Sequence, residues 1–201
     1  MDHTSTLTGL QKALKGARTV GGLDVIYTKL AVDLQNLTDD NASRVIDGCL
    51  NVMCESTESD AVMFARFDEA GETIASVEFA RADFCACNPD KLVNEQLTDW
   101  PWVRSDGHHL RLLEILDTAE PQAAAAEDAA RLGAQSIGSA LILCLGVNGR
   151  IAGFLAFLDG QPREEWDADH KLLLKLLGSS LASGLERMEI QADVADREEL
   201  R

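Results

Sequence analysis

SIGSALILCLGVNGRIAGFLAFL, residues 136–158, carries the strongest structural signal in this chain. Two apolar runs, Ser139–Val147 and Arg150–Leu158, flank the pair Asn148-Gly149. An Asn-Gly pair between β-prone runs predicts a tight hairpin, because both turn residues tolerate a positive φ. Neither run alternates cleanly between apolar and polar residues, so both faces of these strands should be covered. We expect the hairpin at the centre of a sheet, with helices on one face and a lid or pocket on the other.

Upstream of the hairpin, the hydrophobic spacing changes from helical to alternating. It predicts helices and then two strands joined by a Gly-containing turn: helices over 4–17, 23–37 and 42–57, and strands over 61–68 and 73–80. Asp39-Asp40-Asn41 should end one helix and cap the next. We assign residues 1–37 to an N-terminal helical extension and residues 38–185 to one central domain.

The rest of the chain reads as an irregular segment over 81–109, a strand over 110–117 and a helix over 122–132 that follows Pro121. A last helix begins after Asp167, which should cap it, and extends to about residue 199. Its first half is apolar and its second half is mostly charged. We therefore expect residues 186–201 to project from the domain.

Composition excludes several classes of protein. The 201 residues carry 34 acidic and 18 basic side chains, for a net charge of -16, which argues against binding to nucleic acid or an anionic membrane. No apolar run is long enough to span a bilayer, and the N-terminus lacks a signal-peptide core, so we expect a cytoplasmic protein. Five cysteines make no disulfide framework in such a chain, and Cys49, Cys54 and Cys144 read as small core residues.

The order of these elements, with five local motifs, resembles a GAF domain over about residues 38–190. The motifs are the strand Ala61–Phe67 followed by Asp68, the Trp100-Pro101-Trp102 segment, the strand Leu110–Asp117, the helix after Glu120-Pro121, and the stretch from Pro162-Arg163 through Trp166-Asp167 and His170 to Leu172-Leu173. The resemblance implies an α+β fold, with a six-stranded antiparallel sheet, terminal helices on one face and a small-ligand pocket on the other. It also implies a sensory module of a bacterial signalling protein. The output, such as a histidine kinase or an enzyme of cyclic-dinucleotide turnover, would lie beyond residue 201.

Aromatic and cationic side chains gather around the Trp100-Pro101-Trp102 segment, which is the most site-like cluster in the sequence. Trp100, Trp102 and His108 could clamp a planar or anionic ligand. Equally, a tryptophan here could be a lid packed on the sheet, and His108 and His109 could lie in an exposed loop.

Charged and polar residues of the strands complete the predicted ligand site. Alternation in the strand over 61–68 places Phe64 and Arg66 on one face, and we expect that face to be the pocket. On an exposed edge, Arg66 would instead be a solvated cross-strand partner. Asp117, at the end of its strand, and Ser139, at the start of the hairpin, are the remaining candidates.

Catalytic and metal motifs are weak in this sequence. Cys85-Ala-Cys87 could be a redox pair, but its spacing does not fit a zinc knuckle and no second Cys/His pair follows. No residue set supports catalysis, so we predict a non-enzyme without a metal or an identifiable cofactor. A free methionine sulfoxide reductase of GAF fold is the alternative, whereas the Cys-His pair of bilin-binding phytochromes has no match.

The terminal helices each offer an apolar stripe on an otherwise polar surface. Such helices commonly pair in parallel dimers and transmit a shift to the next domain. They could also pack back on their own sheet. The sequence thus favours a homodimeric sensory module that binds an unidentified small molecule, with a pure dimerisation module as a further alternative.

Overall fold

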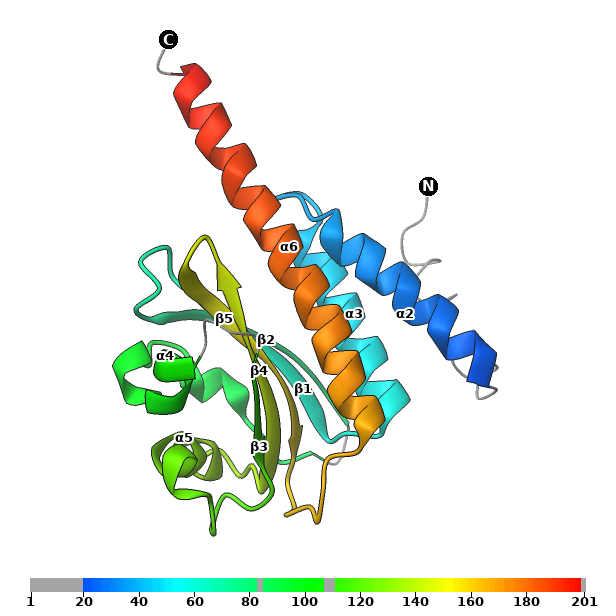
Figure 1. The fold of residues 1–201 in the computed structure, drawn as a ribbon, viewed down its shortest axis with the longest axis vertical. Coiled ribbons are helices and arrows are strands. Elements are labelled where there is room, and N and C mark those ends of the chain that lie inside the picture. The colour runs from blue at the N-terminus through cyan, green and yellow to red at the C-terminus, as the bar shows by residue number, and fades with distance from the viewer. Residues whose placement is uncertain (1–19, 83–84, 107–110, 200–201) are drawn as a thin grey trace.

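The computed structural model describes residues 20–82, 85–106 and 111–199. The helix expected over 4–17 lies outside them. Five strands form one sheet: β1 (Ala61–Phe67), β2 (Ile74–Arg81), β3 (Leu112–Ile115), β4 (Ser139–Val147) and β5 (Arg150–Asp159). Their order is β2-β1-β5-β4-β3, and every neighbouring pair is antiparallel (Figure 1).

The β4–β5 hairpin confirms the prediction made from Asn148-Gly149. Both turn residues have a positive φ, 50° and 79°, as a two-residue hairpin turn requires. β5 is the central strand of the sheet and β4 lies beside it. Almost every residue of both strands is buried, because both faces of the sheet are covered.

The sheet has five strands within the described residues, which corrects the expected six. The strand expected over 110–117 is also shorter, since β3 pairs with β4 only from Leu112 to Ile115. The segment before β3 forms short helices instead of a further strand in its described part. These are η1 (Pro89–Leu92), η2 (Leu97–Asp99) and α4 (Pro101–Asp106).

Three helices cover one face of the sheet: α2 (Val20–Gln35), α3 (Ala42–Thr57) and α6 (Ala168–Glu199). α3 packs on β1 and β2, α6 packs on β4 and β5, and α2 lies mainly against α6 (Figure 1). Asp167 caps α6, because its carboxylate accepts the backbone N–H of His170 at 2.9 Å. Asn41 makes no such cap on α3, since its side-chain oxygen accepts the N–H of Thr38.

The opposite face is covered by residues 85–106, which we call the covering segment, together with α5 (Ala126–Gly133). The core therefore has two halves, one on each side of the sheet. Beyond the sheet, the C-terminal end of α6 extends away from the other elements (Figure 1). No helix in the described part of the chain is long and apolar enough to span a membrane.

Candidate functional site

The face under the covering segment was expected to hold a ligand, and aromatic side chains occupy its centre. Trp100 is fully buried, and its ring lies 5.3 Å from that of Phe154 on β5, centroid to centroid. The ring of Phe67 also lies near that of Phe154, at 6.3 Å. Trp100 is therefore part of the core, as the lid interpretation proposed.

Trp102 is held by its backbone. The N–H groups of Trp102 and Val103 donate to the carboxylate of Asp128 on α5, at 3.2 and 3.4 Å. Burial raises the pKa of Asp128, although these hydrogen bonds act in the opposite direction. The Asp128 carboxylate thereby ties α4 to α5, and the Trp102 ring packs half-buried against the same core.

β1 points its side chains the other way from the prediction. Val62 and Phe64 lie in the helix-side core, whereas Met63 and Ala65 face the covering segment. Two of the β1 residues under the covering segment, Ala61 and Ala65, are small, and they leave volume for the rings of Trp100 and Phe154. The predicted placement of Phe64 in a pocket on the covering side is thus wrong.

The other predicted residues do not converge on one place. The Ser139 hydroxyl is buried and donates to the carbonyl of Gln161 at 2.9 Å, and Asp117 accepts the N–H of Ala119 at 2.8 Å. The first contact joins the start of β4 to the loop after β5, and the second stabilises a local turn. His108 lies outside the described residues.

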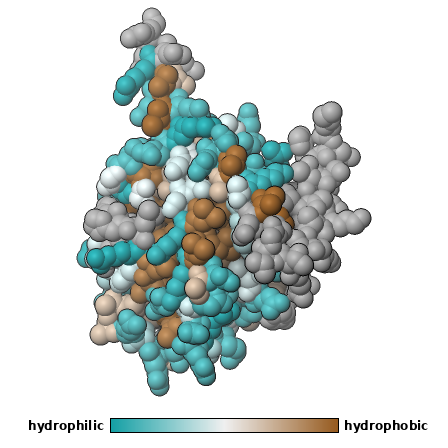
Figure 2. Space-filling model, turned by 45° about the vertical axis from the view of Figure 1, so that its right-hand side comes forward, coloured by the Kyte–Doolittle hydropathy of each residue, from teal (hydrophilic) through white to brown (hydrophobic). Residues whose placement is uncertain are grey.

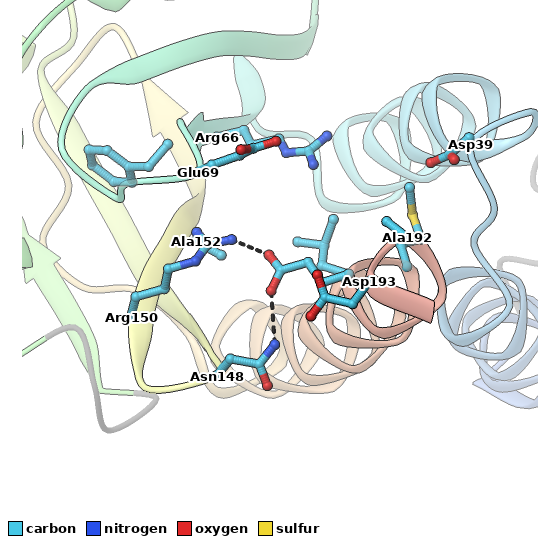
Figure 3. A pocket seen from close by; sticks show the side chains of 12 residues that line it. Asp39, Arg66, Glu69, Asn148, Arg150, Ala152, Ala192 and Asp193 are labelled. Carbon is cyan, nitrogen blue, oxygen red and sulfur yellow. Dashed lines mark hydrogen bonds and ion pairs between the residues drawn. The ribbon is translucent and has the colours of Figure 1, made fainter. Parts of the chain in front are cut away.

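Arg66 belongs to a cavity on the helix side, where the end of β1 and the β4–β5 turn meet α6. This hairpin–helix cavity has a volume of about 420 Å³ (Figure 3). Charged and polar groups surround an apolar part. Its walls are Asp39, Arg66, Glu69, Asn148, Arg150, Glu189 and Asp193, and its apolar part is Ala152, Leu185, Met188 and Ala192. Phe67 also lines it, although its ring packs in the core under the covering segment.

Glu189 on α6 is bound by two residues of the β4–β5 hairpin. Its carboxylate accepts a hydrogen bond from Asn148 Nδ2 at 2.9 Å and forms an ion pair with Arg150. Arg150 also donates through Nη1 to the carbonyl of Asp68, at 3.5 Å. One arginine thus connects the end of β1, the hairpin and α6.

Arg66 is the second cation of the cavity. Figure 3 shows its side chain extending across the upper part of the cavity, toward the side on which Asp39 lies and away from the Arg150–Glu189 pair. Within the described residues, no side chain forms a hydrogen bond or ion pair with its guanidinium. Three carboxylates remain once Arg150 and Glu189 are paired: Asp39, Glu69 and Asp193.

Sequence patterns pointed to Asn148 and Arg66 but missed Arg150 and Glu189. The turn signal identified Asn148 as a structural residue only. Glu189 lies in the charged half of the last helix, and only the packing of α6 shows which of its acidic residues faces the hairpin.

A second polar group lies at the other end of α6, around the buried His170. Its Nδ1 lies 2.7 Å from Asp167 Oδ1, and its Nε2 lies 3.4 Å from Ser59 Oγ. Burial tends to raise the pKa of Asp167, but the hydrogen bonds that it accepts from His170 lower this pKa overall. Ser59 is only 2% exposed, so this Ser-His-Asp chain is a brace between α6 and the start of β1.

A cavity of about 630 Å³ lies beside this brace, between the middle of α2, the end of α3 and the start of α6. It is lined by residues such as Tyr27, Thr57, His170 and Leu176. No group of histidine, cysteine and carboxylate side chains in the described part of the chain is arranged to hold a metal ion.

Comparisons with known proteins show the fold. No family model and no curated protein matches the sequence. Solved structures do match, among them the phycocyanobilin-bound GAF domain of a cyanobacterial phytochrome, with a TM-score of 0.59 and 13% identity over 95% of this chain and 97% of that chain.

Two further solved structures match this chain in fold. The chromophore-binding domain of a bacteriophytochrome from R. palustris gives a TM-score of 0.65 at 12% identity, over 88% of this chain and 64% of that chain. The GAF domain of a phosphoenolpyruvate-protein phosphotransferase from Acinetobacter gives 0.62 at 13% identity, over 86% and 97%. The chain has the α+β fold of a GAF domain.

Proposed function

We propose that this chain is a non-catalytic sensory module, in which a small ligand in the hairpin–helix cavity changes the position of α6. GAF domains commonly serve as ligand-binding sensory modules. The observation that supports this role is that Asn148 and Arg150 bind Glu189 by a hydrogen bond and an ion pair. These contacts join the cavity wall directly to α6. A ligand in this cavity would act on α6 and, through it, on an output domain such as one of cyclic-dinucleotide turnover.

The charges of the cavity define the class of ligand. Arg66 is available for a carboxylate, and Asp39 and Asp193 are available for an ammonium group. Leu185 and Met188 offer apolar surface between these poles. A small aliphatic molecule with both charges, of the amino-acid class, complements this lining better than a nucleotide, whose phosphates would meet the surplus of carboxylates.

A thermal-shift screen with amino acids, organic acids and nucleotides tests the ligand. We expect an amino acid to raise the melting temperature, because a ligand at about 100 times its Kd adds roughly 2.7 kcal/mol to the free energy of unfolding. Arg66→Gln should raise the Kd of this amino acid about tenfold and so reduce the increase in melting temperature. Arg187→Gln is the matched control, since Arg187 lies on α6 but binds Asn36, outside the cavity.

Transmission to α6 is measured separately, by hydrogen exchange of residues 186–199 with and without the stabilising ligand. A ligand-dependent change in exchange, reduced in Glu189→Gln, would support the sensory role. If no compound of the panel binds, or if binding leaves exchange in α6 unchanged, the proposal fails.

Exposed apolar residues on the helix side suggest how two copies associate. Val25 and Val32 on α2, and Leu172, Leu176, Ile190 and Val194 on α6, are between 43% and 69% exposed. Figure 2 shows apolar surface gathered on this side of the molecule. We propose that α6 pairs with α6 of a second copy, so that a shift in one helix is sensed by a dimer.

A further inference from the structure

Cys54, Cys85 and Cys87, from two distant parts of the chain, meet at one end of the sheet. Cys54 comes from the last turns of α3, and the other two follow β2 at the start of the covering segment. The N–H of Cys87 donates to Cys85 Sγ at 3.3 Å, and Cys54 Sγ donates to the carbonyl of Ser59 at 3.2 Å. All three are free thiols.

The three thiols differ in exposure. Cys87 is fully buried and Cys54 is 7% exposed, whereas Cys85 is only partly buried. A reagent from solvent therefore reaches Cys85 first, because Cys87 is shielded from solvent. This is the arrangement of an attacking and a resolving cysteine.

The pKa values of the buried thiols also distinguish them from Cys85 as the thiol that reacts first. Burial, with smaller effects from Cys85, Asp60 and Asp159, raises the pKa of Cys87 to about 12, so Cys87 keeps its proton. Burial likewise raises the pKa of Cys54 to about 11. Arg81 Nη1 lies 3.5 Å from the carbonyl of Cys87, which brings a cation close to the pair. Of the three thiols, Cys85 is the most exposed, and its sulfur accepts a backbone hydrogen bond from Cys87.

We propose that Cys85 is a peroxide-reactive thiol that closes a disulfide with Cys87. The Cys85 thiolate attacks one peroxide oxygen, the O–O bond breaks, and hydroxide leaves, which gives a sulfenic acid. The Cys87 sulfur then attacks Cys85 Sγ as its own proton is lost, the S–O bond breaks, and water leaves as the S–S bond forms. The peroxide is reduced and the two thiols are oxidised. This proposal does not depend on a ligand in the hairpin–helix cavity.

The disulfide would act on the covering segment. Cys87 Sγ now donates to the carbonyl of Ser136 at 3.8 Å, and the next residue, Asn88, donates to the carbonyl of Gln135 at 3.4 Å. Turning Cys87 toward Cys85 removes the first of these contacts. Oxidation would thereby loosen the covering segment from the stretch that leads into β4.

Treatment of the full chain with hydrogen peroxide, followed by differential alkylation and mass spectrometry, tests the proposal. Trypsin cleaves after Arg81 and Lys91, so one peptide carries both Cys85 and Cys87. We expect this peptide to lose two hydrogens and to resist alkylation. Cys85 should also react roughly ten times faster than Cys49 or Cys144, which are buried elsewhere.

Variants separate the two roles. Cys87→Ser should leave a sulfenic acid on Cys85 that dimedone traps, and Cys85→Ser should abolish the reaction at this peptide. Cys144→Ser serves as the matched control and should oxidise like the parent chain. Equal oxidation of all five cysteines, or a disulfide from Cys54 to Cys85 in the parent chain, would overturn the assignment, and neither result requires that a variant folds.

Discussion

Glu78 on β2 carries a partly buried carboxylate with one unsatisfied oxygen. Its Oε2 atom is buried without a hydrogen-bond partner. Burial is the main cause that raises its pKa, the charge of Asp47 adds to the effect, and Arg66 partly offsets it. A buried charge without a partner costs stability, so Glu78 reduces the free energy of unfolding wherever it is ionised.

The sign of its pH dependence follows from this shift. Because the folded-state pKa of Glu78 lies above its unfolded value, the folded state binds the proton more tightly. Its contribution to stability is greatest below the unfolded value of about 4.3 and is lost as pH rises through the folded-state pKa.

Glu78→Gln should therefore raise the free energy of unfolding at pH 7 by about 1 kcal/mol, since it removes the charge at similar volume. The gain should vanish near pH 4. Urea unfolding at several pH values measures it as the difference from the parent chain, which cancels the opposite contributions of Asp68 and Asp167, whose pKa values are lowered. Glu72→Gln, at an exposed position in the β1–β2 turn, should show no such difference.

For single residues, turn and helix-cap positions were predictable from the sequence, whereas the face of the sheet on which a side chain lies was not. Asn148 and Gly149 adopt the positive φ values that their identities favour, and Asp167 caps α6 as expected. Phe64 was assigned to the wrong side of the sheet, because both residue sets of β1 are largely apolar and alternation does not distinguish them. The volume that decides between them comes from Trp100 and Phe154, which lie far away in sequence.

At the scale of elements, α2 and α6 approach each other closely at Gly184. A Cβ atom added there would lie 2.0 Å from the carbonyl oxygen of Leu34 and 3.1 Å from Leu37 Cδ1. The first of these is a backbone atom, so the clash cannot be relieved by a side-chain rotation. Glycine at this position lets the two helices pack backbone to backbone.

Gly184→Ala should lower the free energy of unfolding by about 1–3 kcal/mol, because α2 must move away from α6. On an isolated helix the same change would stabilise by about 1 kcal/mol, so the two effects have opposite signs. Thermal and urea denaturation measure the outcome. Lys175→Ala, at an exposed position of the same helix, should stay within about 0.5 kcal/mol, and a stabilised Gly184→Ala chain would contradict the close contact.

Elements with strong local signals were predictable from the sequence. α3 has the predicted bounds, 42–57, and the hairpin strands begin and end within one residue of those expected. The sixth strand was implied only by the family resemblance. In its described part, the segment before β3 forms η1, η2 and α4 instead, whose short 3-10 and α-helical turns give no periodic pattern.

At the scale of the whole molecule, one face of α6 is repeatedly exposed. Residues 172, 176, 179, 183, 186 and 190 follow at alternating steps of four and three, and all six are exposed. Two leucines and an isoleucine lie toward the two ends, and Ser179, Ser183 and Glu186 lie between them. Such spacing suits the seam of two paired helices, in which small residues allow close approach.

Light scattering at micromolar concentration should therefore give the mass of a dimer. A double substitution, Leu176→Glu with Ile190→Glu, should give a monomer because it places like charges in the seam. Lys175→Glu, at an exposed position beside the seam, is the control and should remain dimeric. A parent chain of monomer mass would exclude the pairing of α6.

The candidate site was the least predictable feature at this scale. The hairpin–helix cavity is built from the α2–α3 connection, the end of β1, the β4–β5 turn and α6, which are spread over most of the chain. No local motif marks such a site. Its residues are ordinary surface charges until the fold brings Arg66, Arg150 and Glu189 together.

The pairing of β1 with β5 has a consequence for how this protein is made. Ala61 pairs with Leu158 and Arg66 with Gly153, so one edge of β1 stays open until most of the chain has left the ribosome. β1 and β2 are close in sequence and can pair early, which leaves the apolar AVMFARF edge without its second neighbour. Contacts between such distant segments form slowly. The nascent chain should therefore depend on chaperones at this stage, and a domain truncated before residue 150 should aggregate.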